Sequence, residues 1–366
     1  MENVPFDFIN RVVALQKSSD ISALRTLHGN FGAVAEEHHK KRFDCYFHFK
    51  PLESKCFAVV QPEPREGCCL LTYAEDNAKY IRHLEINMAM VERRGQREVR
   101  FDDSVFRRLG KLARSAAYVT LELGNRGDCE DVEKFSNIAT KLVHLAPYFN
   151  ELSAAVGKTS RGFEALASKV LTSDRLRAIT IQAPLWHKKF IGELQTVFFK
   201  ASCELLIIEN RQWSIVPGIV DKWCAGNDRY EKKFVCAHGN PNVDLSERFK
   251  RQFSFNWKGY DYPQAIGDLQ IPPWTREQIE DNIQFEYNPT ARFYCLEHPK
   301  IPHHFACLTL VIDLDNILDE FDDVQGEFEQ LGRDEDDYSD FLKEKVAAMG
   351  EADFASRSHF YYLFFC

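Results

Sequence analysis

The feature that most constrains the fold is a strand-like segment that recurs at a nearly fixed interval through the middle of the chain. The runs are HLEINM, YVTLEL, YFNELS, RAITIQ, ELLIIE and KFVCAH. They start at residues 83, 118, 148, 177, 204 and 233, so the steps between them are 35, 30, 29, 27 and 29 residues. A unit that repeats at such a period cannot bury its apolar face alone, so neighbouring units are expected to stack.

Helix-like segments lie between these runs. In residues 104–116 the apolar positions follow helical spacing, and Asp102 and Asp103 favour the helix N-terminus. Five more segments show the same pattern: 130–146, 162–171, 189–201, 214–225 and 244–253. The alternation predicts an α/β fold, and its period is typical of a degenerate leucine-rich-repeat-like strand–helix solenoid. Asn125 and Asn210 are the only hints of the asparagine ladder of such repeats. An ordinary α/β domain with elements of similar length is the alternative.

The two ends of the chain differ from this middle. Residues 1–42 read as a short helical unit, and residues 43–75 as a small antiparallel β insert or cap with three strands (DCYFHF, KCFAVV and GCCLLTY). The strand–helix repeat domain then covers 76–314 and closes with two strands about a turn within 291–314. Residues 315–366 read as an acidic, flexible tail. Its last nine residues, SHFYYLFFC, are strongly apolar and could instead occupy a groove.

Composition limits the classes of partner. The net charge is −9, but residues 313–340 alone carry −12, since they hold thirteen Asp or Glu and the single base Arg333. The remaining body is nearly neutral and gives no reason to expect nucleic acid as a partner. No run approaches the roughly 20 apolar residues of a membrane span, so no membrane partner is expected. The first ten residues lack a signal-peptide pattern, and eleven scattered cysteines suit a reducing compartment, so we expect a cytoplasmic or nuclear protein.

The sequence contains few candidate catalytic or metal-binding residues. The segment CLEHPKIPHHFAC could supply zinc ligands from Cys295, His298, His303 or His304, and Cys307, although buried cysteines and surface histidines are the more ordinary interpretation. The segment VGKTSRG has Leu152 where a phosphate loop needs its first glycine. The acidic run lacks the ligand order of a calcium loop. No nucleophile elbow or HExxH helix occurs, so we expect neither an enzyme nor a cofactor.

The N-terminal segment resembles an F-box, the motif that docks on the Skp adaptor of cullin-based ubiquitin ligases. Val4 and Pro5 stand for its Leu-Pro, and a first helix follows with Phe8, Ile9, Val12, Val13 and Leu15. Ile21, Leu24 and Leu27 match its middle, and Phe31 stands where the family usually has tryptophan. LHGNF replaces the family's usual residues before this aromatic position. With FYCLEHP at residues 293–299, the chain resembles a nematode-expanded family of F-box-type proteins.

The resemblance implies a non-catalytic adaptor in an SCF-type ubiquitin ligase. The Skp adaptor would bind Val4, Pro5, Phe8, Ile9, Val12, Leu15, Leu24, Leu27 and Phe31, and the repeats would bind a substrate protein. In that case Pro5, Phe8, Ile9, Val12 and Leu24 should be partly exposed in the isolated chain. The alternative is a protein-binding repeat protein that has lost its link to the ligase, with the first helices packed wholly onto the repeat.

Overall fold

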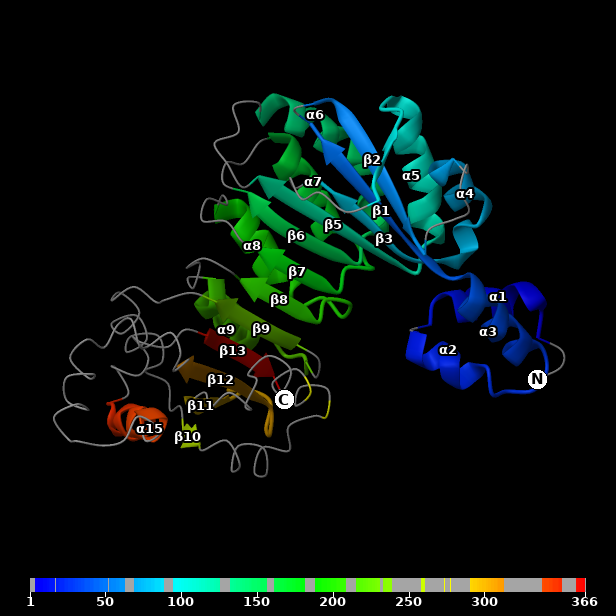
Figure 1. Ribbon diagram of the computed structural model, residues 1–366. Coiled ribbons are helices and arrows are strands. Elements are labelled where there is room, and N and C mark those ends of the chain that lie inside the picture. Colours follow the sequence, from blue (N-terminus) through cyan, green and yellow to red (C-terminus); the bar gives the residue numbers. More distant parts are fainter. Residues whose placement is uncertain are drawn as a thin grey trace. The chain divides into compact units, whose positions relative to one another are not determined.

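The chain divides into two compact units, Met1–Phe190 and Ile191–Cys366, and each is described by itself. The computed structural model describes residues 4–16, 18–51, 53–62, 69–88, 95–125, 132–156, 161–181, 188–208, 215–230, 233–238, 258–260, 273, 277, 290–312, 338–350 and 360–365. Figure 1 shows that both units combine helices with strands, which confirms the α/β class. The helix expected over 244–253 lies outside the described residues.

The first unit begins with helices and continues as a mixed sheet. Its helices are α1 (Phe6–Ala14), α2 (Ser18–Leu24), α3 (Asn30–Lys41), α4 (Leu70–Asp76), α5 (Asp103–Ser115), α6 (Val132–Leu142) and α7 (Arg161–Leu171), with short 3-10 turns η1 (Ala78–Tyr80) and η2 (Val143–Tyr148). Its strands are β1 (Phe43–Lys50), β2 (Lys55–Gln61), β3 (Ile81–Asn87), β4 (Arg97–Val99), β5 (Tyr118–Asn125), β6 (Glu151–Val156) and β7 (Ala178–Ile181). The helices expected within residues 1–42 are therefore present.

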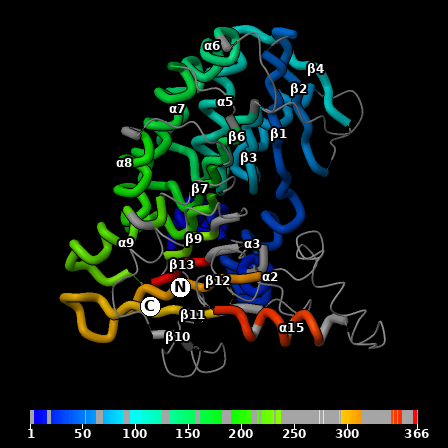
Figure 2. Tube along the Cα trace, turned by 90° about the vertical axis from the view of Figure 1, so that its left-hand side faces the viewer, coloured from blue at the N-terminus to red at the C-terminus, as the bar shows by residue number. Residues whose placement is uncertain are grey.

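The strands of the first unit follow the order β4-β2-β1-β3-β5-β6-β7. From β1 through β3, β5 and β6 to β7 each pair is parallel. Because each successive strand is added on the same side and such crossovers are right-handed, the connecting helices should share one face. Figure 2 shows α6 and α7 on one side of β1, β3 and β6.

The apolar residues at alternate positions of the parallel strands are buried, as expected for the face of a sheet beneath a helix layer. The buried strand residues are Leu84, Ile86, Val119, Leu121, Leu123, Leu152, Ala154, Ile179 and Ile181. The helices contribute buried residues at three- and four-residue spacing, such as Val105, Phe106, Leu109 and Leu112 in α5. Apolar residues of the strands and apolar residues of the helices are thus buried together, which accounts for the strand–helix alternation in the sequence.

Asn150, which directly precedes β6, ties three consecutive strand–helix connections together. Its Oδ1 accepts a hydrogen bond from the Val119 amide at 2.9 Å, and its Nδ2 donates to the Arg175 carbonyl at 3.3 Å. The Asn150 amide also donates to the Val119 carbonyl at 2.8 Å. The side chain is 7% exposed, so water cannot easily replace these partners. Asn125 and Asn210 were the asparagines that the sequence pointed to, and Asn150 was not among them.

We predict that Asn150→Ala lowers the free energy of unfolding of the first unit by about 2–3 kcal/mol, because it leaves a buried amide and a carbonyl without partners. Denaturant unfolding of the purified chain checks this value. Thr172→Ala removes an exposed hydrogen bond to the Lys169 carbonyl and should cost only about 0.5 kcal/mol. Equal losses in the two variants would contradict the role given to Asn150.

The expected three-stranded insert over residues 43–75 is corrected in two respects. β1 and β2 do form an antiparallel pair, but β1 also pairs with β3, so both belong to the main sheet. GCCLLTY, expected as the third strand, contributes instead to helix α4, while β4 takes the place beside β2. Leu70, Leu71 and Ala74 are buried at helical spacing, and this burial selects the helix over the strand.

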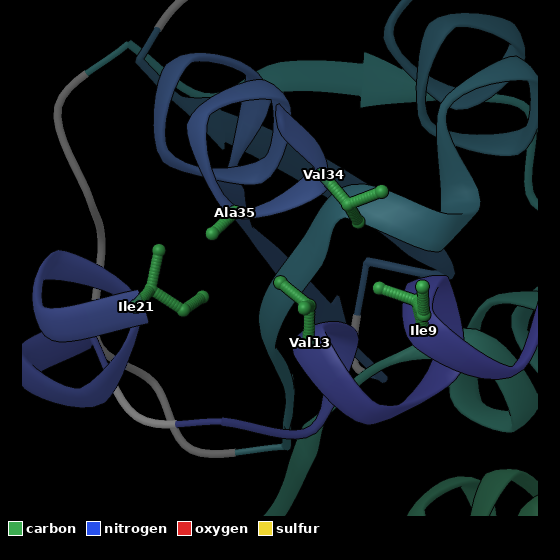
Figure 3. Packing of buried hydrophobic residues seen from close by; sticks show 5 residues of the cluster. All are labelled: Ile9, Val13, Ile21, Val34 and Ala35. Carbon is green, nitrogen blue, oxygen red and sulfur yellow. The ribbon is translucent and has the colours of Figure 1, made fainter. Parts of the chain in front are cut away.

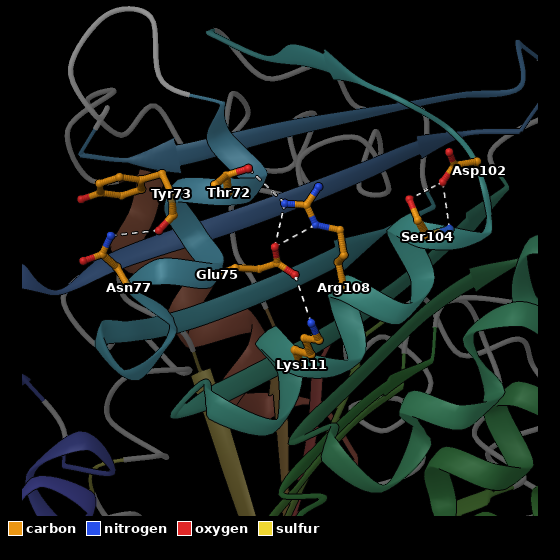
Figure 4. A network of polar contacts seen from close by, with 8 residues as sticks. All are labelled: Thr72, Tyr73, Glu75, Asn77, Asp102, Ser104, Arg108 and Lys111. Atoms are coloured by element: carbon orange, nitrogen blue, oxygen red, sulfur yellow. Dashed lines mark hydrogen bonds and ion pairs between the residues drawn. The ribbon is translucent and has the colours of Figure 1, made fainter.

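Polar contacts fix α4 against α5, as Figure 4 shows. Arg108 of α5 donates to the Glu75 carboxylate from Nε at 2.9 Å and from Nη2 at 2.7 Å. The N-terminus of α5 is capped by Asp102, whose carboxylate accepts a hydrogen bond from the Ser104 amide at 2.8 Å. The sequence-based prediction of a helix start at Asp102 and Asp103 is therefore confirmed.

The second unit is also mixed. Its described strands are β8 (Leu205–Ile208), β9 (Lys233–His238), β10 (Lys258–Tyr260), β11 (Thr290–Glu297), β12 (Phe305–Ile312) and β13 (Phe360–Phe365), in the order β10-β11-β12-β13-β9-β8. The described helices after α7 are α8 (Lys188–Val197), α9 (Ile215–Ala225) and α15 (Tyr338–Ala348). The two strands expected within 291–314 are present as the antiparallel pair β11 and β12.

The expectation of a flexible tail over residues 315–366 is wrong for its described parts. α15 contacts β11, where Arg292 donates to the Met349 carbonyl at 2.7 Å. β13 occupies the sheet between β9 and β12. Most of the acidic run lies outside the described residues. Within the described part of the chain, no helix combines the length and apolar character that crossing a membrane requires.

Candidate partner-binding surface

The first three helices pack around a small core of their own. Ile9 and Val13 of α1 meet Val34 and Ala35 of α3 and Ile21 of α2, as Figure 3 shows. Val4, Leu24 and Phe31 pack against this cluster and are partly buried. α1 starts directly after Pro5, whose carbonyl accepts hydrogen bonds from the Phe8 and Ile9 amides. A proline suits this place because a helix start leaves amides without helical partners.

A neighbouring face of α1 carries apolar side chains that this core does not use. Phe8 is 56% exposed and Leu15 is 64% exposed, while Val12 between them is half-buried. These residues are spaced four and three apart, so they share one face, which we call the apolar stripe. Phe6 and Leu27 are also exposed, at 51% and 44%. A group of large apolar side chains left on the surface of a unit is a candidate site for a partner protein.

The structure separates the nine predicted partner-binding residues into three groups. The exposed ones are Pro5, Phe8, Leu15 and Leu27, and the partly buried ones are Val4, Val12, Leu24 and Phe31. The expected exposure of Ile9 is wrong, because its side chain is 0% exposed in the three-helix core. Sequence spacing had treated positions 8, 9, 12, 13 and 15 as one stripe. They divide between two faces of α1, and α3 covers only the face with Ile9 and Val13.

Gly32 explains the close approach of α3 to the turn that carries Leu27. A Cβ atom built on Gly32 would lie 1.9 Å from the Leu27 carbonyl oxygen, so only glycine fits. Gly29 precedes α3 with φ of +83°, a conformation that glycine adopts without strain. The HGN residues that depart from the usual F-box pattern are thus part of a tight α2–α3 connection.

Arg42 holds the end of α1 against the segment that follows α3. Its guanidinium donates to the carbonyls of Gln16 at 2.8 Å, Val13 at 2.9 Å and Ala14 at 2.8 Å. These carbonyls lie in the last turn of α1 or just after it. The Val13 carbonyl also accepts from the Gln16 amide at 3.2 Å, and the guanidinium supplies the further donors that the end of a helix lacks. Burial, and then the nearby Arg82, lower the pKa of Arg42 to about 10, while Asp44 acts in the opposite direction. The side chain remains charged at neutral pH.

We predict that Arg42→Met destabilises α1 by about 2–3 kcal/mol, because three carbonyls lose a charged donor. Hydrogen exchange of the α1 amides measures this local opening directly. Lys40→Met is the matched control: Lys40 is exposed on α3 and pairs with Glu36, so its loss should cost less than about 1 kcal/mol. Unchanged exchange in α1 of the Arg42 variant would refute this role.

His38 links α3 to α1 from a buried position. Its Nε2 lies 2.7 Å from Asn10 Oδ1, which can only accept, so Nε2 carries the proton. The ring contacts Tyr80 edge-on at 5.1 Å, and the Tyr80 hydroxyl donates to the Glu37 carboxylate. Burial, and then the positive charges of Arg42 and Lys79, lower the pKa of His38 to about 4. Among the described residues, no group forms a hydrogen bond with Nδ1, so a second proton on the ring would have no acceptor.

We predict that the first unit loses stability as the pH falls from about 6.5 to about 4. The fold holds His38 neutral with a pKa of about 4, whereas the unfolded chain binds a proton near pH 6.5. The contribution is therefore complete above pH 6.5 and is lost toward pH 4, by on the order of 3 kcal/mol. Thermal unfolding as a function of pH measures it.

Two variants isolate this effect. His38→Gln should flatten the pH dependence in that window, whereas His39→Gln, at the exposed neighbouring position, should leave it unchanged. The pKa of Glu37 is lowered to about 2 by the hydrogen bond from Tyr80, so its contribution is lost only at more acidic pH. An identical slope in the His38 variant and the native chain would exclude His38 as the cause.

Arg42 and His38 are the residues of this region that sequence reasoning missed. A histidine on a short helix is exposed to solvent by default, but His38 is 0% exposed. The signal was its position four residues after Val34, on the face that α3 buries. No comparable pattern indicates Arg42, because its partners are carbonyls at the end of a helix distant in sequence.

The zinc candidates are not arranged as a metal site. Cys295 and Cys307 lie opposite each other on β11 and β12. His298 Nε2 donates to the Trp223 carbonyl at 2.8 Å, and its Nδ1 accepts from the Lys300 and Ile301 amides at 3.0 and 3.1 Å. His304 Nε2 lies 3.4 Å from the Tyr230 amide. Across the described ranges, no three His, Cys, Asp or Glu side chains form a group that could hold a metal ion.

Comparison of the chain with protein-family models, curated proteins and solved structures finds no match.

Proposed function

We propose that this chain is the substrate-recognition subunit of an SCF-type ubiquitin ligase, and that its three N-terminal helices bind the Skp adaptor. The observation that carries the proposal is the apolar stripe of α1, where Phe8 and Leu15 project from a unit whose core is already complete without them. Exposed side chains at this spacing suit a helix that is buried in the groove of a partner. The resemblance of residues 4–31 to an F-box indicates the Skp adaptor as that partner.

The strand–helix region would hold the substrate protein near the ubiquitin-loaded partner of the ligase. Its parallel strands follow one another in chain order from β3 to β7, which suits the degenerate leucine-rich-repeat-like interpretation. Holding a substrate raises its effective concentration and requires no bond-making residue of this chain. The proposal therefore includes neither an enzymatic activity nor a cofactor, and it places the protein in the cytoplasm or nucleus.

A protein-binding repeat protein without a ligase link is the second candidate. It is favoured by the contacts that attach the helices to the rest of the first unit, such as the hydrogen bond from Tyr80 to Glu37. On that interpretation the N-terminal helices are a structural part of the repeat. The exposure of Phe8 and Leu15 favours the ligase proposal, since a purely structural helix has no use for two exposed large apolar side chains.

The two candidates are separated by co-purification with the Skp adaptor. The native chain should retain the adaptor, and Phe8→Asp with Leu15→Asp should reduce retention at least tenfold, which corresponds to about 1.4 kcal/mol of binding free energy. Both substitutions lie at exposed positions, so the three-helix core should survive them. The matched control is Arg107→Asp with Arg114→Asp on the exposed side of α5, which should retain the adaptor fully.

Two results would count against the ligase proposal. A native chain that retains no adaptor removes the ligase link and leaves the repeat-protein candidate. A stripe variant that retains as much adaptor as the native chain shows that α1 is not the binding surface. Circular dichroism of each variant confirms that the comparison is made between folded chains.

A further inference from the structure

The C-terminal strand lies in the interior of the sheet of the second unit. Figure 1 shows β13 between β9 and β12. It pairs antiparallel with β12 from Ala306↔Phe365 to Val311↔Phe360, and antiparallel with β9 from Phe360↔His238 to Phe365↔Lys233. The strand therefore satisfies the backbone groups of two neighbours along its whole length.

Four consecutive side chains of β13 are buried, and they alternate between the two sides of the sheet. Tyr362, Leu363, Phe364 and Phe365 are each at most 2% exposed. The Phe365 ring packs against Trp223 of α9 at 5.4 Å, and the Tyr362 ring packs against Phe234 of β9 at 5.8 Å. A strand buried on two faces needs a nearly continuous apolar run, which explains the composition of FYYLFF.

The two neighbours of β13, strands β9 and β12, are each paired with a further strand along their other edge. β9 is paired with β8 along its far edge, and β12 is paired with β11 over eight residue pairs. α15 is held to β11 by Arg292, which donates to the carbonyls of Val346 and Met349. Removal of β13 alone would leave two formed strand edges facing one slot. Unpaired strand edges of this kind accept an added strand.

The covalent connection between β12 and β13 affects their pairing through the effective concentration of β13. β12 ends at Ile312 and β13 starts at Phe360, so a long segment separates two strands that are adjacent in space. A covalent connection acts by setting an effective concentration, which is about millimolar for a short linker and less for a long one. The binding free energy must come from the backbone pairing and the buried aromatic side chains themselves.

We propose that β9 and β12 form a strand-binding slot whose resident ligand is the chain's own C-terminal strand, and that an aromatic-rich extended peptide supplied as a separate molecule occupies the same slot. The ligand class follows from the contacts: an antiparallel strand of six residues with large apolar side chains on both faces. This slot is independent of the proposed adaptor surface on α1.

The test uses the full chain with a site-specific protease sequence inserted between Ala352 and Asp353, after α15 and before β13. The folded protein is cut, and gel filtration shows whether the C-terminal fragment remains bound. A fluorescent peptide of residues 358–365 is then added in excess. The control peptide carries Leu363→Asp and Phe365→Asp, which place charges where both side chains are buried. The uncut chain is the second control.

We expect the fragment to stay bound after the cut and the native peptide to replace it. Uptake of the native peptide should exceed that of the variant peptide at least tenfold, and the uncut chain should take up little, because its tethered strand competes. Equal uptake of both peptides, or equal uptake by cut and uncut chains, would refute the proposal. So would a fragment that never exchanges, or a cut chain that unfolds or takes up no peptide despite the excess.

Discussion

The packing of one apolar face of each parallel strand against a single layer of helices is the interaction on which the rest of the first unit depends. In β3, β5, β6 and β7 the alternate residues beneath the helices are buried, and the helices add residues at three- and four-residue spacing. No single strand–helix unit can satisfy both its apolar face and its strand edges, so stability is shared between neighbours. Asn150 shows this sharing directly, because one buried amide bonds to the strand connections before and after its own.

The burial of apolar side chains also gives the first helix two different faces. Ile9 and Val13 are used in the three-helix core, whereas Phe8 and Leu15 remain on the surface. Arg42 and His38 hold this arrangement from the far end of α3, through the carbonyls of α1 and the side chain of Asn10. The proposed adaptor surface is therefore attached to a fixed framework, and a partner would meet a helix whose orientation is already set.

Much of the strand–helix order could be predicted from the sequence because it depends on local periodicity. The strands expected from residues 83, 118, 177, 204 and 233 are present as β3, β5, β7, β8 and β9. Other elements required tertiary information. The run YFNELS was expected as a strand from residue 148, but a 3-10 turn extends to Tyr148 and β6 starts at Glu151. GCCLLTY has strand-like composition, yet Leu70, Leu71 and Ala74 are buried on one face of α4.

The sequence by itself determined the class of the fold and the presence of an apolar, amphipathic start, because both follow from the spacing of apolar residues along the chain. It could not determine which side of α1 is covered, since that depends on where α3 packs. Nor could it place FYYLFF, whose composition suits any buried strand. Only the tertiary structure put that strand between β9 and β12, because its partners are distant in sequence and pair through backbone groups that every residue carries.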